Sequence, residues 1–536
     1  MKVVFVALGQ EQLGISILSA VLRRAGHETS LVFDPALFHD RYYFDIPILR
    51  DIFDRDDAVV DEIVAEKPDL LAFSVLTFTY TWALDIARRA KERLGVPVIF
   101  GGVHPSAVPE VCLENDCVDY VCVGEGEDAI VRLCDELGRG VHRPAAPIPN
   151  LWWRDERGAT VRGPNASFIQ DIDSLPFWDK ELWEDVVPIG MSYLTMTARG
   201  CPYRCTFCFN NFFAKLPGKS GGKYVRQRSV DRCLEELHAA KARYDIQLVD
   251  FEDDIFTLDK AWLREFLPRY EREIGVPFSC LVHPRFMDDD MARWLADAGC
   301  VRVQMGIQSA DEEYKRTVLL RLEKDSHLER ALASMAKAGL SMKLDHILGL
   351  PGEPVTAQEA ARELYVRYRP ARVNTYWLSY LPGTDITKDA LREGRLTQAD
   401  VDAIDRGDSR LFHYADSGTS PEAQSMYQKY DVLFRMLPLL PESVRGKLRG
   451  QDLPDLPPAV AGAIGFVCDL TSALRQRDQE TMVYAKQYAY HLGRLLPGMI
   501  RGDKGAPPKR RRSPPPPPAP VNPPPRSLPL IAVSRG

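Results

Sequence analysis

Three cysteines lie within eight residues, in the run Arg-Gly-Cys-Pro-Tyr-Arg-Cys-Thr-Phe-Cys that contains Cys201, Cys205 and Cys208. A structural zinc site usually takes four protein ligands in two pairs, but here one C-x-x-C is preceded by a single extra cysteine and no second pair is nearby. Three thiolates on a four-iron four-sulfur cluster would bind three irons and leave the fourth free for another ligand. The spacing therefore favours a catalytic cluster over a zinc site completed by a distant histidine or over buried inert thiols.

Short apolar strands alternate with amphipathic helices over residues 1–145. We expect strands at 3–8, 28–33, 70–75, 96–100 and 120–123, and helices at 13–25, 59–66, 81–94, 108–114 and 127–137. This α/β alternation predicts a doubly wound Rossmann-like domain, whose parallel sheet binds ligands at the carboxyl ends of its strands. Glycines that allow tight turns or a close ligand stand at these ends: Gly9, Gly14, Gly101, Gly102, Gly124 and Gly126.

A bridging segment rich in Pro, Trp and Asp covers 146–190 and includes short strands near 151–153 and 160–162. A second alternation follows over 191–390, with helices that include 230–244 and 328–338 and strands at 193–197, 248–251, 278–282, 301–305, 343–348 and 373–379. Such βα units predict a partial or closed parallel barrel with chemistry at the carboxyl ends of its strands. The three cysteines follow the first of these strands.

Residues 391–500 have no strand pattern and predict a small helical domain, with helices at 421–436 and 471–496. Some of its aromatic side chains could cover the barrel, although at helical spacing they more often belong to a core: Tyr427, Tyr430, Phe434, Tyr484, Tyr488 and His491. From residue 501 the basic run at 509–512 and the Pro tract at 514–518 predict a disordered, partly polyproline II tail.

The composition is that of an ordinary folded protein: of 536 residues, 45% are hydrophobic and 27% charged, and the net charge is −7. The tail from 501 carries eight Lys or Arg and one Asp, so the rest of the chain is more acidic than the total and a poor surface for nucleic acid. No apolar run is long enough for an export signal or a membrane span. The eleven cysteines are an odd number in mostly apolar surroundings, so we expect reduced thiols and a cytoplasmic protein.

The cysteine motif, with Phe207 before its last cysteine, resembles that of the radical S-adenosylmethionine (SAM) superfamily. Segments after later strands resemble its SAM-binding motifs: Glu252, Asp253 and Asp254 after the second strand, Gln308 and Ser309 after the fourth, Gly349, Gly352 and Glu353 after the fifth, and 381–384 after the sixth. The resemblance implies that the three cysteines hold a [4Fe-4S] cluster with SAM on its open iron.

Acidic residues after the second strand are implied to meet the SAM amine. The common Gly-Gly-Glu is missing there, so Glu252, Asp253 and Asp254 remain alternatives, with a helix cap or a solvated loop as the structural alternative for the two aspartates. Arg285 after the third strand is a candidate for the SAM carboxylate, or else forms a surface salt bridge.

The first domain, with Gly101-Gly102-Val103-His104-Pro105 and Gly124-Glu125-Gly126-Glu127 after its fourth and fifth strands, is similar to the cobalamin-binding domain of one radical SAM branch. The resemblance implies that Ser74, Thr77 and Thr79 donate hydrogen bonds to the nucleotide tail of cobalamin. The loop at 8–14 lacks the Asp-x-His-x-x-Gly histidine that ligates cobalt in other cobalamin domains. His104 is either a cobalt ligand or an ordinary loop histidine, and a fold that has lost its cofactor is the alternative for the whole domain.

These resemblances, over about residues 1–390, imply an enzyme that cleaves SAM to a 5'-deoxyadenosyl radical and uses cobalamin as methyl carrier. The expected reaction methylates an unactivated carbon or a phosphinate of a small-molecule or natural-product substrate. Alternatives are cyclisation, rearrangement or oxidation without methyl transfer, a non-catalytic cobalamin or redox sensor, and transfer-RNA modification, which the acidic body disfavours. The expected partners are the substrate and an electron donor such as flavodoxin or ferredoxin, with no nucleic acid and no membrane.

Overall fold

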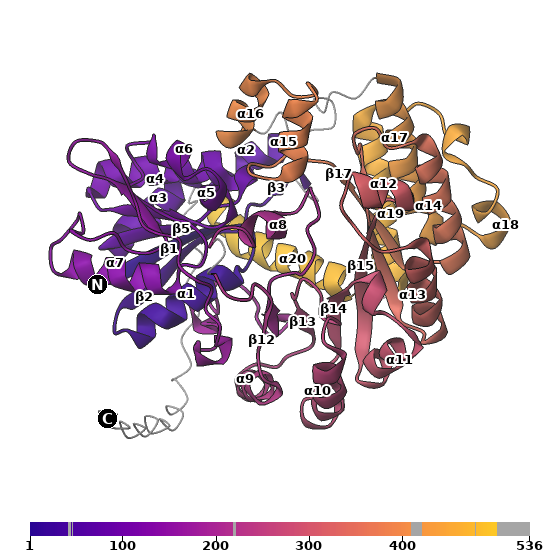
Figure 1. Cartoon of the computed structure of the whole chain (residues 1–536), viewed down its shortest axis with the longest axis horizontal. Helices are drawn as coiled ribbons and strands as arrows, with labels where there is room; N and C mark the ends of the chain where they lie inside the picture. Colours follow the sequence, from indigo (N-terminus) through magenta and orange to yellow (C-terminus); the bar gives the residue numbers. More distant parts are fainter. Residues whose placement is uncertain (41–43, 46, 218–220, 409–420, 477–478, 501–536) are drawn as a thin grey trace, which may run out of the picture.

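The computed structural model describes residues 1–40, 44–45, 47–217, 221–408, 421–476 and 479–500. Two large sheets organise the chain (Figure 1). The tail predicted from residue 501 lies outside the described residues. Among the helices that are described, none is both long enough and apolar enough to cross a membrane.

The first sheet is doubly wound, as predicted. Its parallel strands are β1 (Lys2–Leu8), β2 (Glu28–Asp34), β5 (Leu70–Ser74), β6 (Val98–Gly101) and β7 (Tyr120–Cys122), in the order β2-β1-β5-β6-β7. Alternate residues of β1 enter opposite layers: Val3 and Phe5 pack with α1 (Leu13–Arg24) and α7 (Glu127–Gly138), and Val4 and Val6 with α3 (Asp56–Glu66) and α4 (Tyr80–Leu94). Because helices bury both faces, the central strands such as β1 and β5 are nearly continuous apolar runs, whereas the edge strand β2 begins with polar residues.

The bridging segment extends this sheet and then connects it to the barrel. β8 (Leu151–Arg154) pairs antiparallel with β7, and β9 (Thr160–Arg162) pairs antiparallel with β8. Further on, Asp179 accepts a hydrogen bond from the Ser19 hydroxyl of α1 at 2.6 Å. The buried Lys180 ammonium pairs with Glu11 and donates to the Leu194 carbonyl at 2.6 Å. The bridge therefore fixes α1 against the first barrel strand.

The second sheet is wholly parallel. Its strands, in hydrogen-bonded order, are β10 (Tyr193–Thr195), β13 (Val249–Phe251), β14 (Phe278–Val282), β15 (Cys300–Gln308), β16 (Ser341–Leu348) and β17 (Arg372–Trp377). The helices that cover its outer face are α9 (Val230–Arg243), α10 (Lys260–Glu273), α11 (Asp289–Asp297), α13 (Asp325–Lys337) and α14 (Val355–Tyr368). In the described ranges β10 and β17 each bond to a single strand, so the sheet is a partial barrel.

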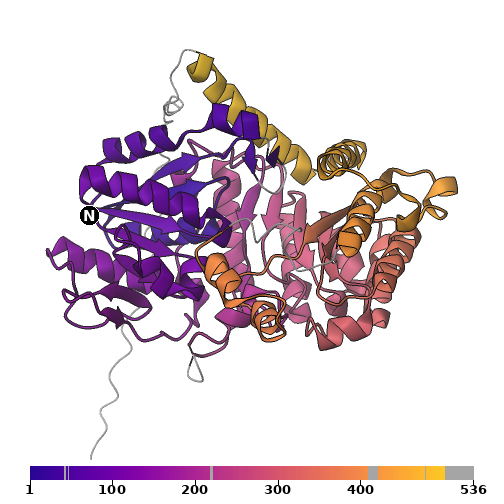
Figure 2. The same ribbon diagram turned by 90° about the horizontal axis from the view of Figure 1, so that it is seen from above.

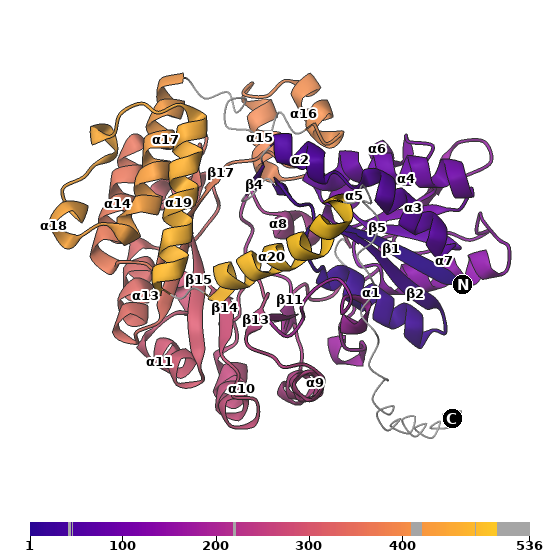
Figure 3. The same ribbon diagram turned by 180° about the vertical axis from the view of Figure 1, so that it is seen from behind.

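The helices that follow the barrel lie in three places. α15 (Asp385–Arg392) and α16 (Gln398–Asp405) lie over the junction of the first sheet and the barrel (Figure 2). α17 (Pro421–Met436) and α19 (Pro458–Gln476) pack beside β17, and α20 (Gln479–Ile500) runs behind the barrel towards the first sheet (Figure 3). The single helix expected at 471–496 is therefore wrong, because this stretch is divided between α19 and α20.

The aromatic residues proposed as a barrel cover have other roles. Tyr427, Tyr430 and Phe434 of α17 are buried core side chains, and the Phe434 ring lies 4.9 Å from that of His346. Tyr488 and His491 of α20 contact the first domain instead, through Phe38 and Phe33 respectively. The side chain of Tyr484 lies outside the described part of the chain.

Short elements complete the fold: β3 (His39–Asp40), β4 (Phe44–Asp45), α2 (Pro47–Phe53), α5 (Val103–Ala107), α6 (Pro109–Leu113), β11 (Ala198–Arg199), α8 (Phe209–Phe213), β12 (Arg226–Gln227), α12 (Glu312–Thr317) and α18 (Glu442–Arg445).

Candidate active site

The three cysteines lie on one loop at the carboxyl end of the first barrel strand, between β11 and α8. The loop begins at Gly200, where φ is +86° and a Cβ atom would lie 2.5 Å from the Tyr224 carbonyl oxygen, so only glycine fits. Thr206 fixes its second half: its amide donates to the Leu319 carbonyl at 3.1 Å, and its own carbonyl accepts from the Ile386 amide at 2.9 Å. The loop is therefore held by two segments that come much later in the chain.

The three thiols fit a cluster better than a single ion. In the described residues no group of three His, Cys, Asp or Glu side chains is placed to hold one metal ion. In a [4Fe-4S] cluster each cysteine binds a different iron, so the sulfur atoms stand farther apart than around one zinc. Burial, with a smaller contribution from neighbouring thiols, raises the pKa of Cys201 to about 12 and that of Cys205 to about 11. Three thiolates here need a cationic metal centre to compensate their charge.

The acidic residues after β13 have different surroundings. Asp253 is buried, and its carboxylate accepts hydrogen bonds from the Thr197 amide at 3.0 Å and the Thr197 hydroxyl at 2.6 Å. Burial nevertheless raises the pKa of Asp253 to about 6. Asp254 lies beside the cysteine loop and accepts from the Asn210 amide group at 2.7 Å. Glu252 and Asp254 are exposed, so these two, rather than the buried Asp253, are oriented to meet a ligand.

An aromatic pair connects the cysteine loop to the end of β14. Tyr203, between the first two cysteines, stacks on His283 with ring centroids 4.3 Å apart and planes 13° apart. Burial lowers the pKa of His283 to about 2, and nearby cations such as Arg321 lower it as well. The predicted Arg285 follows directly and is hydrogen-bonded to the Tyr203 side chain. Arg285 is exposed next to the cysteines, where an anion could reach it.

The motifs after β15 and β16 meet in a buried polar group. The register of β15 against β16 shifts between Gly306 and Gln308, and Gln308 adopts a φ of +66°. Ser309 is fully buried beside Glu353, and Gln358 donates to the Glu353 carboxylate at 2.7 Å. Burial raises the pKa of Glu353 to about 8, so this side chain is a neutral acid at pH 7. Gly349 and Gly352, both with positive φ, form the turn that places Glu353 there.

The residues predicted to contact cobalamin lie along one edge of the first sheet. Gly9 follows β1, Ser74 ends β5 and Thr77 follows it, Gly101 ends β6 and Gly102 follows it, Gly124 and Gly126 follow β7, and Gly14 lies in the first turn of α1. At Gly102 φ is +102° and a Cβ would lie 2.9 Å from the Val75 backbone, so glycine is required. At Gly9 and Gly14 a Cβ would meet nothing within 4 Å, so this edge has open space beside its backbone. That these residues contact cobalamin stays a prediction.

His104 is fully buried in α5. Its Nδ1 lies 3.2 Å from the Thr77 hydroxyl, and its ring centroid lies 4.2 Å from that of Tyr80, with the two planes tilted by 38°. Burial lowers the pKa of His104 to about 4, so the ring is neutral. To ligate cobalt it would have to leave this packing, and its role as a ligand stays a prediction.

A set of ion pairs that the sequence analysis did not single out joins the two domains. Arg199 Nη2 lies 2.7 Å from Glu127 Oε1, and Arg199 Nη1 lies 3.2 Å from Glu125 Oε1. Arg226 Nη1 lies 2.7 Å from the same Glu125 oxygen. We call these four residues the Glu–Arg clasp. Arg199 directly precedes the cysteine loop, so the clasp connects that loop to the loop after β7.

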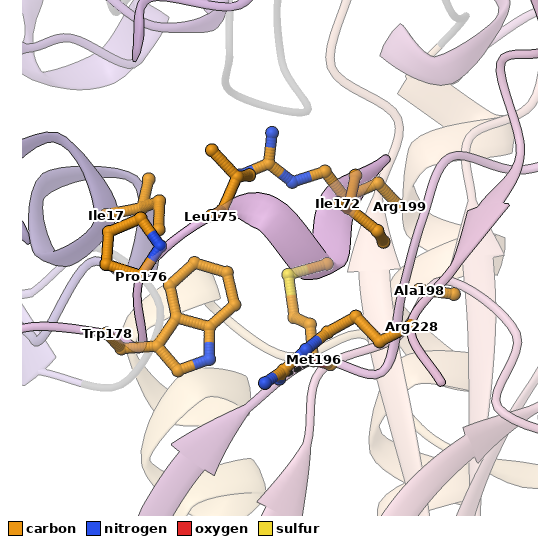
Figure 4. A pocket seen from close by; sticks show the side chains of 9 residues that line it. All are labelled: Ile17, Ile172, Leu175, Pro176, Trp178, Met196, Ala198, Arg199 and Arg228. Atoms are coloured by element: carbon orange, nitrogen blue, oxygen red, sulfur yellow. Dashed lines mark hydrogen bonds between the residues drawn. The ribbon is translucent and has the colours of Figure 1, made fainter. Parts of the chain in front are cut away.

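The seam between the domains also contains a small hollow, seen in Figure 4. Ile17 of α1, Ile172 and Trp178 of the bridge, and Met196 after β10 line it, with Arg199 and Arg228 among the labelled side chains. Most of the side chains that line the hollow are apolar. We assign the hollow to the domain interface rather than to a cofactor.

Comparisons with known proteins agree with this geometry. Residues 3–134 match the B12 binding domain family, and residues 195–364 match the radical SAM superfamily. The chain is therefore a cobalamin-binding radical SAM protein, with a B12-binding domain followed by a radical SAM domain. Its cofactors are cobalamin, SAM and a [4Fe-4S] cluster.

The similar proteins are named for two kinds of reaction, methyl transfer and ring closure. An uncharacterized methyltransferase of Pyrococcus horikoshii is 27% identical over 72% of this chain and 79% of the relative. Cytidylyl-2-hydroxyethylphosphonate methyltransferase of Streptomyces wedmorensis is 23% identical over 71% and 78%. The anaerobic magnesium-protoporphyrin IX monomethyl ester cyclase of Rubrivivax gelatinosus is 23% identical over 69% and 64%.

Solved structures share the fold. The cobalamin-dependent SAM radical enzyme OxsB superposes with a TM-score of 0.62 at 14% identity, covering 93% of this chain and 84% of OxsB. The radical SAM methyltransferase TsrM from Kitasatospora setae, with cobalamin and a [4Fe-4S] cluster bound, gives 0.57 at 20% identity over 73% and 78%.

Proposed function

We propose that this protein transfers a methyl group from SAM, through cobalamin, to an unactivated carbon or a phosphinate of a small-molecule or natural-product substrate. One observation carries the proposal: the Glu–Arg clasp ties the cobalamin edge of the first sheet directly to the cysteine loop. Cofactors bound at these two places would be near enough to share one substrate. The methyltransferases among the relatives support the same conclusion.

When bound, the cluster would supply the electron that cleaves SAM to a 5'-deoxyadenosyl radical, and cobalamin would carry the methyl group. The chain's own residues position these groups. Cys201, Cys205 and Cys208 would hold the cluster, and Asp254 or Glu252 would pair with the SAM ammonium. Arg285 would meet the SAM carboxylate, because it is a cation beside the loop. Neutral Glu353 can donate a hydrogen bond as an acid, since burial raises its pKa to about 8.

The experiment is anaerobic reconstitution with iron, sulfide and hydroxocobalamin, followed by turnover with SAM labelled in its methyl carbon. Candidate substrates are fractions of a small-molecule extract. We expect both S-adenosylhomocysteine and 5'-deoxyadenosine, with label in a product. Cys205→Ala should abolish both, whereas Cys468→Ala, which replaces a buried thiol of α19, should not. 5'-Deoxyadenosine alone, with no label transferred, would refute methylation.

A second candidate is a radical cyclisation or rearrangement without methyl transfer. It is favoured by the similarity to the cyclase of Rubrivivax gelatinosus. The same labelled SAM distinguishes the two, because a cyclase forms a product of unchanged carbon count.

We also propose that the protein works in the cytoplasm with an electron donor such as flavodoxin or ferredoxin. All eleven cysteines are free, which suits a reducing compartment.

A further inference from the structure

Asn210 lies two residues after the last cysteine, in α8, and its side chain joins the cysteine loop to the acidic residues after β13. Its amide nitrogen donates to Asp254 Oδ1 at 2.7 Å, and its amide oxygen accepts from the Tyr224 hydroxyl at 2.5 Å. An ionised carboxylate can only accept a hydrogen bond, so the contact with Asp254 decides which end of the amide is the nitrogen. The side chain of Asn210 therefore has one defined orientation.

Tyr224, which binds the oxygen end of this amide, is held by other parts of the chain. Its ring packs against that of Phe168 in the bridging segment, with ring centroids 5.0 Å apart. Its carbonyl accepts from Arg226 Nε at 3.1 Å, and Arg226 belongs to the Glu–Arg clasp. Gly200, at the start of the cysteine loop, lies against the same Tyr224 carbonyl. The hydroxyl that orients the amide is thus fixed relative to both the clasp and the loop.

Asn210 also meets one of the cluster ligands, Cys208. Burial raises the pKa of Cys208, and hydrogen bonds from the backbone N–H and the side chain of Asn210 oppose this rise. Asp254 is close to the same thiol and to that of Cys201, because its charge raises the pKa of both cysteines. An asparagine amide has two N–H donors. In Asn210 one of them binds Asp254 and the other is available to Cys208.

The next residue, Asn211, has a different set of contacts. It is buried, and its amide nitrogen donates to Asp385 Oδ2 of α15 at 2.7 Å. Asn211 therefore attaches α8 to a later helix, whereas Asn210 faces the candidate active site. The two amides provide a matched pair for separating a role in the site from a role in the fold.

We propose that Asn210 is a positioning residue that couples the SAM site to the cluster. One N–H would hold the Asp254 carboxylate in the orientation that meets the SAM ammonium. The other would bond to the Cys208 thiolate and stabilise the reduced cluster. This inference rests on the proposed function, because it takes Asp254 as the partner of that ammonium.

The two hydrogen bonds have separate physical effects. The bond to Asp254 Oδ1 restricts rotation of the carboxylate and leaves its other oxygen for a cation, so less side-chain order has to be gained when SAM binds. The bond to the thiolate stabilises the electron added to the cluster and therefore raises its reduction potential. Tyr224 supports both effects, because without its hydroxyl the amide can rotate away from its two partners.

The first test measures the reduction potential of the cluster in the reconstituted full chain, without SAM or substrate. A redox titration followed by electron paramagnetic resonance compares the wild type with Asn210→Ala, Tyr224→Phe and the matched control Asn211→Ala. At the potential where half of the wild-type cluster is reduced, about a fifth or less should be reduced in Asn210→Ala, because the bond to the thiolate is lost. Tyr224→Phe should lie between these two proteins, and Asn211→Ala should match the wild type.

The second test measures equilibrium binding of radiolabelled SAM to the oxidised cluster, which cannot cleave it. Asn210→Ala and Asp254→Asn should each weaken binding at least about tenfold, because the first loses the orientation of the carboxylate and the second its charge. The double change should bind SAM within about twofold of Asp254→Asn alone, since Asn210 acts on SAM through Asp254. Asn211→Ala should bind SAM like the wild type.

Four results would overturn the proposal. The first is a reduction potential of Asn210→Ala equal to that of the wild type. The second is an equal shift in Asn211→Ala, which would indicate a disturbed helix. The third is an additive loss of SAM affinity when Asn210→Ala and Asp254→Asn are combined. The fourth is normal SAM binding by Asp254→Asn, which would leave Asn210 nothing to position.

Tyr224→Phe decides the question if Asn210→Ala retains no iron, because that change leaves the cysteine loop and α8 intact. A reduction potential and a SAM affinity equal to those of the wild type would then overturn the proposal. The expected results in both tests, with no label transferred from methyl-labelled SAM to a product, would instead refute the proposed function and leave the role of Asn210 standing.

Discussion

The Glu–Arg clasp gives a prediction with a magnitude. Arg199→Met removes the guanidinium from Glu127, whose side chain is only 7% exposed and has Arg199 as its ion-pair partner in the described structure. Glu125 keeps Arg226 and also accepts from the Ile169 amide at 2.9 Å. The loss of stability therefore arises mainly at Glu127. Breaking a buried pair on one side typically costs about 3–5 kcal/mol, because a charge stays buried without compensation.

The double variant Arg199→Met with Glu127→Gln should recover part of this cost. No buried charge is then left, so we expect it to be about 2 kcal/mol more stable than Arg199→Met alone. The exposed pair of Arg139 with Glu136 is the control, since Arg139→Met should cost less than about 1 kcal/mol.

Hydrogen exchange of peptides that cover 120–130 and 198–208 measures the local opening. Arg199→Met should speed exchange in both peptides by about a hundredfold or more, because each 1.4 kcal/mol changes an opening constant tenfold. During turnover of Arg199→Met, the amount of methylated product formed per 5'-deoxyadenosine should fall, since the clasp no longer holds the two cofactor sites together. Unchanged exchange in Arg199→Met would refute this reasoning, and so would a double variant less stable than the single one.

Three further predictions concern single positions. Asp254→Asn should raise the KM for SAM at least about tenfold with little loss of stability. Asp253→Asn should instead lower the apparent Tm by several degrees, because Asp253 accepts hydrogen bonds from Thr197 at the end of the first barrel strand, β10. Equal effects of the two changes on KM would contradict this. The pKa of Glu353 is about 8 in the folded chain, above its ordinary value of 4.5, so the folded state binds a proton that the unfolded state has lost in this range. The free energy of unfolding should therefore fall as pH rises between about 4.5 and 8, by at most about 5 kcal/mol. Glu353→Gln should flatten this dependence of the apparent Tm, and a persistent slope of the same size would count against the assignment. Gly102→Ala should impair hydroxocobalamin retention, measured by absorbance after gel filtration, because φ is +102° and the backbone is close. Gly14→Ala has space for its methyl group and should keep the fold, so similar losses of secondary structure in both variants would refute the steric argument.

Most of the fold was predictable because its strands are short apolar runs between amphipathic helices. β14 covers the expected residues 278–282. β15 runs past its expected end at Met305: apolar residues still alternate as far as Ile307, and pairing with β16 continues to Gln308 across a shift of register. The break between α19 and α20 was missed because the polar residues there, from Arg475 to Glu480, include neither Gly nor Pro to mark a helix end.

The site was predictable only where its residues are close in sequence. The cysteines and the strand-end motifs are local patterns. Which of Glu252, Asp253 and Asp254 can meet a ligand depends on Thr197, because its hydrogen bond occupies Asp253. Thr197 and Asp253 are far apart in sequence and come together only in the folded chain. The Glu–Arg clasp joins residues 74 and 101 positions apart, so no local pattern contains it.

The hydrogen bonds of Thr206 set an order of assembly. The Thr206 carbonyl can accept its hydrogen bond only after the Ile386 amide has been synthesised, about 180 residues later in the chain. At usual rates of synthesis this takes about ten seconds or more, during which the cysteines are translated but their loop is not closed. Cluster insertion therefore belongs after the barrel and α15 have formed, and a ribosome stalled before residue 386 would present three unprotected thiols.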